Sequence, residues 1–177
     1  MGIQTIYQWL EDAGLWSPDI DLERQAMVKS GGSTDTNLYF IKEGTLRIFV
    51  AEEEEEKTIR FGYAGNIITA LDSFITEQPS DLYIQAIKRT RIRSISKPDY
   101  LAFMQATPER QLVWDQLLQQ LLLQQMERER DLLIRSPQER YQRVLQRSPQ
   151  LFQEVPHKYI ANYLRMTPET LSRLKKS

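Results

Sequence analysis

The change of periodicity at Pro98 constrains the fold of this chain more than any other feature of its sequence. Before Pro98, short runs rich in β-branched and aromatic residues recur at intervals of roughly ten residues, and after it the apolar residues repeat at helical spacing. With 177 residues, the chain is long enough for one ordinary domain and a small second one. We therefore expect an α+β protein in which a β-rich module precedes a helical one.

The β-rich part is predicted to follow an amphipathic helix over residues 3–15. Strands are then expected, with a turn around Gly44 between the first two, at residues 38–41, 46–50, 57–63, 82–87 and 90–95. Short strands separated by glycines and prolines indicate an antiparallel β-roll of the jelly-roll type. Five consecutive glutamates at residues 52–56 are interpreted as a solvated hairpin loop rather than a cation site.

The first helical stretch is long and has no Gly or Pro inside it. Pro108 is placed to open it, and the pattern continues from Glu109 to about Arg135, roughly 40 Å at 1.5 Å per residue. Its leucines lie on more than one face, so a sheet on one side would leave apolar surface in water. We interpret it as a dimerisation helix that pairs with a second copy through Leu118, Leu121, Leu122, Gln125, Glu129 and Leu132. The alternative is a core helix packed within one chain.

The C-terminal region has the pattern of a helix-turn-helix. Residues 136–139, Ser-Pro-Gln-Glu, form a capping box that starts a new helix, which Ser148 and Pro149 interrupt. Two more helices follow, with Thr167 as the cap of the second. Their inward faces and the turn between them carry Ile160, Ala161, Leu164, Met166, Leu171 and Leu174. Arg165 falls at a turn position where a left-handed backbone favours glycine, a conformation that costs about 1 kcal/mol for other residues.

Charge is divided unevenly along the chain. The net charge is −1, but residues 1–110 hold 12 Lys and Arg against 17 Asp and Glu, whereas residues 136–177 hold 8 against 3. Such asymmetry is typical of a protein in which one part meets a polyanion. We predict that the C-terminal region binds double-stranded DNA through His157, Lys158, Arg165, Thr167, Pro168, Glu169, Thr170, Ser172, Arg173, Lys175 and Lys176. The alternative is an ordinary helical hairpin with solvated charges.

The order of these parts resembles the Crp/Fnr family of bacterial transcription regulators. The similarity covers nearly the whole chain, with its motifs at residues 39–47 in the roll, 65–74 at the family's phosphate-binding cassette and 160–175 in the helix-turn-helix. The resemblance implies a homodimer that binds promoter or operator DNA, with RNA polymerase as a further partner. Because the sequence has neither a membrane span nor a signal segment, we expect a cytoplasmic protein. By the same resemblance, Glu169 and Arg173 read bases.

The resemblance also implies a division of the chain into three parts. These are a cyclic-nucleotide-binding-like β-roll sensor domain over residues 1–108, the dimerisation helix over residues 109–135 and the helix-turn-helix domain over residues 136–177. In the family, the roll binds an effector and the second helix of the C-terminal motif enters the major groove. The sequence stops near the end of that helix, so we expect the β-hairpin wing of many relatives to be absent or truncated.

The cassette departs from the family's pattern for cyclic nucleotides. The family has a glutamate after a glycine for the ribose and a later arginine for the cyclic phosphate, whereas this chain has Asn66 after Gly65 and Ser80 in the arginine's place. Asp81 beside Ser80 would repel a phosphate. We expect no tight binding of cyclic AMP. The pocket candidates for an unknown small-molecule effector are Gly65, Asn66, Thr69, Ser80 and Asp81.

Composition excludes several classes of chemistry. The chain has no cysteine and a single histidine, His157, so we expect no Fe–S cluster, no haem in the roll, no metal site and no enzymatic activity. An enzyme on a cupin-type barrel is a weak alternative, because such sites usually need several histidines. No apolar run approaches the roughly 18 residues of a membrane span. A sensor or interaction protein that has lost DNA binding is the main alternative to a regulator.

Overall fold

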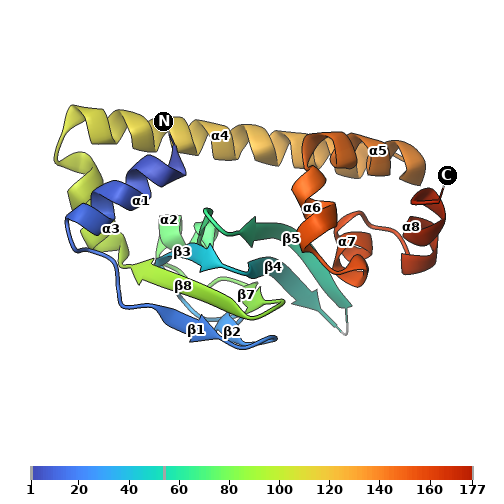
Figure 1. The fold of residues 1–177 in the computed structure, drawn as a ribbon, viewed down its shortest axis with the longest axis horizontal. Helices are drawn as coiled ribbons and strands as arrows, with labels where there is room; N and C mark the ends of the chain where they lie inside the picture. The colour runs from blue at the N-terminus through green and yellow to red at the C-terminus, as the bar shows by residue number, and fades with distance from the viewer. Residues whose placement is uncertain (1, 54, 177) are drawn as a thin grey trace.

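The computed structural model describes residues 2–53 and 55–176 and has an α+β architecture (Figure 1). Two four-stranded sheets form a roll, and every strand pair within them is antiparallel. One sheet has the order β1 (Ile20–Leu22), β8 (Thr90–Ile95), β3 (Leu38–Glu43) and β6 (Ile67–Ile68). The other has the order β2 (Met27–Lys29), β7 (Leu82–Ala86), β4 (Thr45–Glu52) and β5 (Glu55–Tyr63). The predicted antiparallel β-roll is confirmed.

Gly44 is the point at which the chain passes from one sheet to the other. β3 and β4 belong to different sheets, so the predicted turn is a crossing point with a single residue between the strands rather than a hairpin. Gly44 has φ +90°, and a Cβ there would lie 2.4 Å from Oγ1 of Thr90. Only glycine fits because the backbone is left-handed and the neighbouring chain is too close.

The glutamate run forms the tip of the β4–β5 hairpin. Glu52 pairs with Glu55 across the tip, and Glu53 has φ +57°. These residues are exposed, which confirms the interpretation as a solvated hairpin loop, while Glu54 lies outside the described residues.

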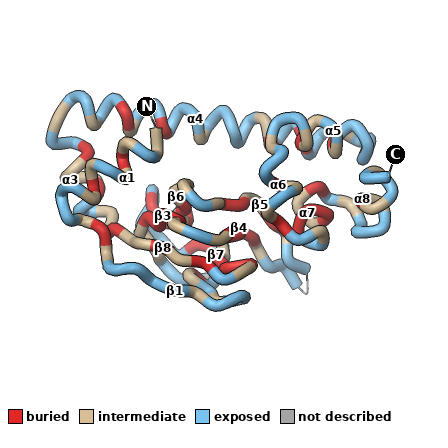
Figure 2. The backbone as a smooth tube through the Cα atoms, viewed as in Figure 1, coloured by how far each residue is buried: buried red, intermediate tan, exposed pale blue. Residues whose placement is uncertain are grey.

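Three helices close one end of the roll. These are α1 (Ile3–Asp12), α3 (Lys97–Gln105) and the start of α4 (Pro108–Leu133), and the short α2 (Leu71–Thr76) follows β6. Their shared core with the roll contains Ile6, Leu10, Phe40, Tyr100, Met104, Val113 and Leu117. α4 runs along the whole molecule and leaves its outer side exposed (Figures 1 and 2). The long helix is confirmed, and it ends two residues before Arg135.

Four short helices form the C-terminal module, a name used here for α5 (Pro137–Arg147), α6 (Pro149–Glu154), α7 (His157–Tyr163) and α8 (Pro168–Leu174). Both predicted caps are confirmed. Ser136 Oγ accepts from the Glu139 N–H at 3.3 Å, and Thr167 Oγ1 accepts from the Thr170 N–H at 3.2 Å. Each cap satisfies a backbone donor that the first helical turn leaves free.

The C-terminal module packs against the roll of the same chain. Phe61 and Ile87 of the roll belong to the same apolar cluster as Val144, Leu151, Val155, Tyr159, Ile160, Ala161, Leu164 and Leu171. Asn162 Oδ1 accepts from the Thr58 N–H at 2.8 Å, and its Nδ2 donates to the Glu56 carbonyl at 2.7 Å. Because Asn162 completes the edge of β5, the first helix of the predicted motif is fixed to the sheet. No helix in the described part of the chain is both long and apolar enough to cross a membrane.

Candidate nucleic-acid interface and effector pocket

The turn between α7 and α8 has the backbone that its sequence predicts. Arg165 has φ +54°, the left-handed conformation expected at this position. Arg140, which is 7% exposed, holds the turn from the side of α5. Its Nε donates to the Leu164 carbonyl at 2.6 Å and its Nη2 donates to the Arg165 carbonyl at 3.1 Å. The side chain of Arg140 thereby holds the backbone of the turn between α7 and α8.

The outer face of α8 and the residues that flank this helix carry most of the predicted DNA-binding residues. Leu171 is fully buried beneath it. Glu169 is the second residue of the helix, and its own backbone N–H and the Thr167 hydroxyl hold the pKa of its carboxyl below its usual value. Among the predicted contact residues here, Thr170 and Ser172 are half-buried, and the exposed ones are Thr167, Pro168, Glu169, Arg173, Lys175 and Lys176.

The remaining predicted contact residues lie on α7 and in the turn. Lys158 is exposed, with its Nζ 4.6 Å from the centroid of the Tyr159 ring, and His157 is half-buried at the start of α7. Arg165 is exposed and lines a hollow with Glu55 and Glu56 of the β4–β5 hairpin. The structure therefore brings the predicted set to one end of the molecule, with acidic residues beside the turn.

An ionic network that the sequence did not reveal ties α4 to the C-terminal module. Asp131 has no exposed side-chain surface and pairs with Arg143 at 2.9 Å and with Arg147. Arg128 donates to the Tyr163 carbonyl, and its guanidinium lies 3.7 Å from the centroid of the Tyr163 ring. These residues look like ordinary surface charges of a long helix, and only the fold shows that they face another element.

The predicted pairing residues of α4 are divided between its two sides. Leu118, Leu122 and Leu132 are 37%, 63% and 42% exposed, and Gln125 and Glu129 are exposed as well. Leu121 instead is half-buried and lines a cavity against the roll, so it lies off the exposed side. The exposed side also carries apolar residues that the heptad assignment omitted, namely Leu112, Leu123, Met126 and Leu133.

The predicted effector residues do not converge on one cavity. Gly65 and Asn66 form the β5–β6 turn, where Asn66 Oδ1 accepts from the Tyr63 N–H at 3.1 Å. Thr69 donates its hydroxyl to the Asn37 carbonyl at 2.8 Å. Ser80 is 3% exposed and its Oγ accepts from the Leu82 N–H at 3.0 Å, while Asp81 is exposed. Most of their polar groups are therefore used within the fold.

The cavity between the roll and the part of α4 around Leu117 is small and mostly apolar. The cavity there has a volume of about 50 Å³ and is lined mainly by Ile48, Ile67, Ile68, Leu71, Trp114, Leu117 and Leu121. Ligand pockets usually measure about 300–1,000 Å³. A nucleotide would not fit without displacing these side chains.

Lys29 places a buried cation beside Ser80, which the sequence did not indicate. Lys29 is 3% exposed, and its Nζ donates to the carbonyls of Ser30, Ser80 and Leu82 at 3.0, 2.8 and 2.7 Å. Burial lowers the pKa of this ammonium group. All three donors are occupied by backbone oxygens, so Lys29 holds the loop instead of offering a free cation. Across residues 2–53 and 55–176, no three acidic or histidine side chains are grouped to hold a metal ion.

One family model matches the part of the chain that forms the roll. Residues 20–107 match the family model of the cyclic nucleotide-binding domain. A search of curated proteins finds no match to this chain.

Solved structures share the fold over most of the chain. A CooA mutant from Carboxydothermus hydrogenoformans has a TM-score of 0.71 at 19% identity, and the similarity covers 90% of this chain and 74% of that one. FixK2 from Bradyrhizobium japonicum has a TM-score of 0.74 at 14% identity, covering 90% and 82%. CLP from Xanthomonas campestris, described as a c-di-GMP-responsive global regulator, has a TM-score of 0.70 at 14% identity, covering 98% and 90%. At these identities the similarity is one of fold.

Proposed function

We propose that this chain is a Crp/Fnr-like transcription regulator that binds double-stranded DNA as a homodimer. The observation that carries the proposal is the α7–turn–α8 unit, in which Arg165 has the left-handed turn backbone and Thr167 caps the second helix. The outer face of α8 presents Glu169 and Arg173, and the two residues that follow the helix add two more cations. Such side chains read base edges and bind phosphates. The fold shared with structural neighbours that are transcription regulators supports the same function.

The exposed side of α4 gives the proposed dimer its interface. Two copies paired through this side would present two α8 helices. A dimeric helix-turn-helix protein binds two DNA half-sites about one helical turn apart, roughly 34 Å. Bivalent binding raises the affinity that one short helix supplies. RNA polymerase is a further predicted partner.

Arg173→Ala tests DNA binding. Duplexes are first selected from a random-sequence pool with the unaltered chain, and affinity for the enriched duplex is then measured by fluorescence anisotropy. Losing one arginine contact to a base should weaken binding about 10- to 100-fold, since such a contact contributes about 1–3 kcal/mol of discrimination. Binding should also weaken steeply with salt, because cations of the protein replace counterions of the phosphates.

Arg24→Ala is the matched control, because Arg24 is an exposed arginine of the roll, outside the C-terminal module. It should bind the enriched duplex nearly as tightly as the unaltered chain. If Arg173→Ala and Arg24→Ala bind equally well, the regulator proposal fails. A sensor or interaction protein without DNA binding would then be the better reading.

The roll is proposed not to bind cyclic AMP in the family's usual way. The cavity between the roll and the part of α4 around Leu117 is only about 50 Å³. Among the described residues around Ser80, Lys29 supplies no free cation because three backbone carbonyls saturate it. A buried phosphate needs a charged or hydrogen-bonding partner to offset its desolvation. A calorimetric titration with cyclic AMP should give no sub-micromolar affinity, and such an affinity would contradict this part of the proposal.

A further inference from the structure

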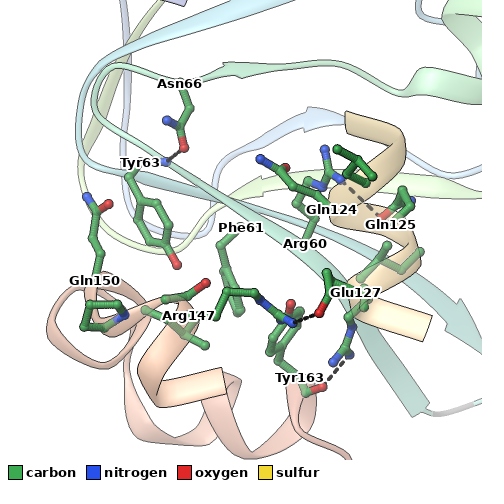
Figure 3. A pocket seen from close by; sticks show the side chains of 16 residues that line it. Arg60, Phe61, Tyr63, Asn66, Gln124, Gln125, Glu127, Arg147, Gln150 and Tyr163 are labelled. Atoms are coloured by element: carbon green, nitrogen blue, oxygen red, sulfur yellow. Dashed lines mark hydrogen bonds and ion pairs between the residues drawn. The ribbon is translucent and has the colours of Figure 1, made fainter. Parts of the chain in front are cut away.

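A second and larger cavity lies where the roll, α4 and the C-terminal module meet (Figure 3). Its volume is about 590 Å³, within the usual range for ligand pockets, and its walls come from β5, α4, α5, α6 and α7. It is distinct from the small cavity between the roll and the part of α4 around Leu117, although Arg60 lines both.

Three arginines from three different elements line this cavity, namely Arg60 of β5, Arg128 of α4 and Arg147 of α5. Arg147 is compensated by buried Asp131. Arg60 and Arg128 form no ion pair within residues 2–53 and 55–176. Arg60 Nη2 donates only to the Gln125 amide oxygen at 3.1 Å, and Arg128 donates to a backbone carbonyl. Two cations of the wall therefore lack a carboxylate partner.

Arg128 is buried and Arg60 is half-buried, so the missing counter-charge is costly, above all at Arg128. Arg128 is 7% exposed, and its Nη1 has no hydrogen-bond partner. Burial lowers the pKa of both guanidinium groups. Glu127, the acidic residue of the wall, is already paired with Arg130 and Arg143. A buried cation normally has an anionic partner, so the wall is prepared for an anion that the chain itself does not supply.

Aromatic and amide side chains complete the wall. Phe61 and Tyr163 lie with ring centroids 5.5 Å apart, and Tyr63 extends from β5 toward α6 (Figure 3). Gln124 and Gln150 add amide groups from α4 and α6. Aromatic faces accommodate a planar ring, while amides both donate and accept hydrogen bonds.

We infer that this cavity is a binding site for a small organic anion that carries a planar ring and a phosphate or carboxylate group. Arg60 and Arg128 would neutralise the anionic group, and Tyr63 and Phe61 would contact the ring. Because the walls come from the roll, α4 and α7, a bound ligand would contact both the roll and the first helix of the helix-turn-helix. Its effect on DNA affinity rests on the proposed function, but its binding does not.

Titration calorimetry on the full chain tests the site with phenyl phosphate and benzoate as probes. At least one should bind saturably with one molecule per chain, and the stronger of the two assigns the anionic group as phosphate or carboxylate. Arg60→Gln and Arg128→Gln should each weaken binding by roughly tenfold or more, because each removes a charge-assisted partner. Arg24→Gln, which alters an exposed arginine outside the cavity, should bind like the unaltered chain.

Gln124→Trp guards against a folding defect in Arg128→Gln. Gln124 is an exposed residue on the cavity's wall, so a tryptophan there fills the space without removing a cation. Circular dichroism should show this variant folded, and probe binding should be lost. The inference is overturned if neither probe binds saturably. It is also overturned if Arg60→Gln and Gln124→Trp bind the probe as the unaltered chain does, or if Arg24→Gln weakens binding as much as Arg60→Gln does. Probe binding that survives alongside absent DNA binding would reject the proposed function and leave this site standing.

Discussion

Arg165 shows how much of a turn a single residue decides. Its φ of +54° is a conformation that L-residues other than glycine adopt at a cost of about 1 kcal/mol. The surrounding contacts fix the backbone in this state, because Arg140 donates to the carbonyls of both Leu164 and Arg165. The contacts of Arg140 therefore hold the strained backbone at Arg165, where a glycine would remove the strain.

Replacing Arg165 by glycine should stabilise the chain relative to replacing it by alanine. Both variants remove the same exposed side chain, but only glycine relieves the left-handed backbone, so its free energy of unfolding should be higher by about 0.5–1 kcal/mol. Urea unfolding followed by circular dichroism measures the difference.

Lys158 supplies the control, because it is exposed within the right-handed helix α7. There the order should reverse, with glycine less stable than alanine by about 1 kcal/mol. Equal stabilities of the glycine and alanine variants at Arg165 would mean that the turn carries no strain.

Residues whose role depends on distant parts of the chain could not be predicted. The caps at Ser136 and Thr167 act on residues three positions away, so a local pattern suffices to identify them. Arg47 is 2% exposed and lies between the rings of Phe49 and Tyr159, the latter from α7. Nothing in the strand around Arg47 indicates a helix more than a hundred residues later, and Lys29 and Arg128 escaped prediction for the same reason.

At the scale of elements, the length of a strand or helix decides whether the sequence predicts it. The strands near residues 38–63 and 82–95 have enough residues for a period of two to be visible, as α4 has for a helical period. β1, β2 and β6 have three residues or fewer and form because a neighbouring strand offers free backbone groups. No periodicity exists in so short a segment.

Helix α3 is different, because the helical spacing after Pro98 predicts helix here and a local start signal, which could have given its first residue, is present as well. Ser96 caps it by accepting from the Asp99 N–H at 3.3 Å, and Pro98 stands in its first turn. This is the same arrangement that predicts α5 correctly at Ser136. Pro98 marks the change from the β-rich part to the helical part, because β8 ends at Ile95 and the proline lies in the first turn of α3.

At the scale of the whole molecule, the two sides of α4 explain its unusual composition. Its inner side contributes Val113 and Leu117 to the core beside the roll. The outer side leaves Leu122, Met126 and Leu133 exposed at 63%, 45% and 80%. Exposed leucines aligned on one side of a long helix are characteristic of an interaction surface, since water solvates them poorly. The proposed homodimer buries this surface.

Leu122→Glu should convert the proposed dimer into a monomer. Two copies of the new carboxylate would face each other across the paired helices, where like charges and lost apolar contact both oppose association. Sedimentation velocity at micromolar concentration should show a dimer for the unaltered chain and a monomer for the variant. DNA affinity should fall by roughly 10²-fold or more, because bivalent binding is lost.

Gln120→Glu separates pairing from charge alone. Gln120 is exposed on the same helix but, at about 100° per residue, lies about 200° around the axis from Leu122. It adds the same negative charge to each copy, so a variant that stays dimeric and binds DNA nearly as tightly assigns the effect of Leu122→Glu to the paired surface. A monomeric unaltered chain that still binds the enriched duplex would place DNA binding in a single copy, and α4 would then need another partner for its exposed leucines.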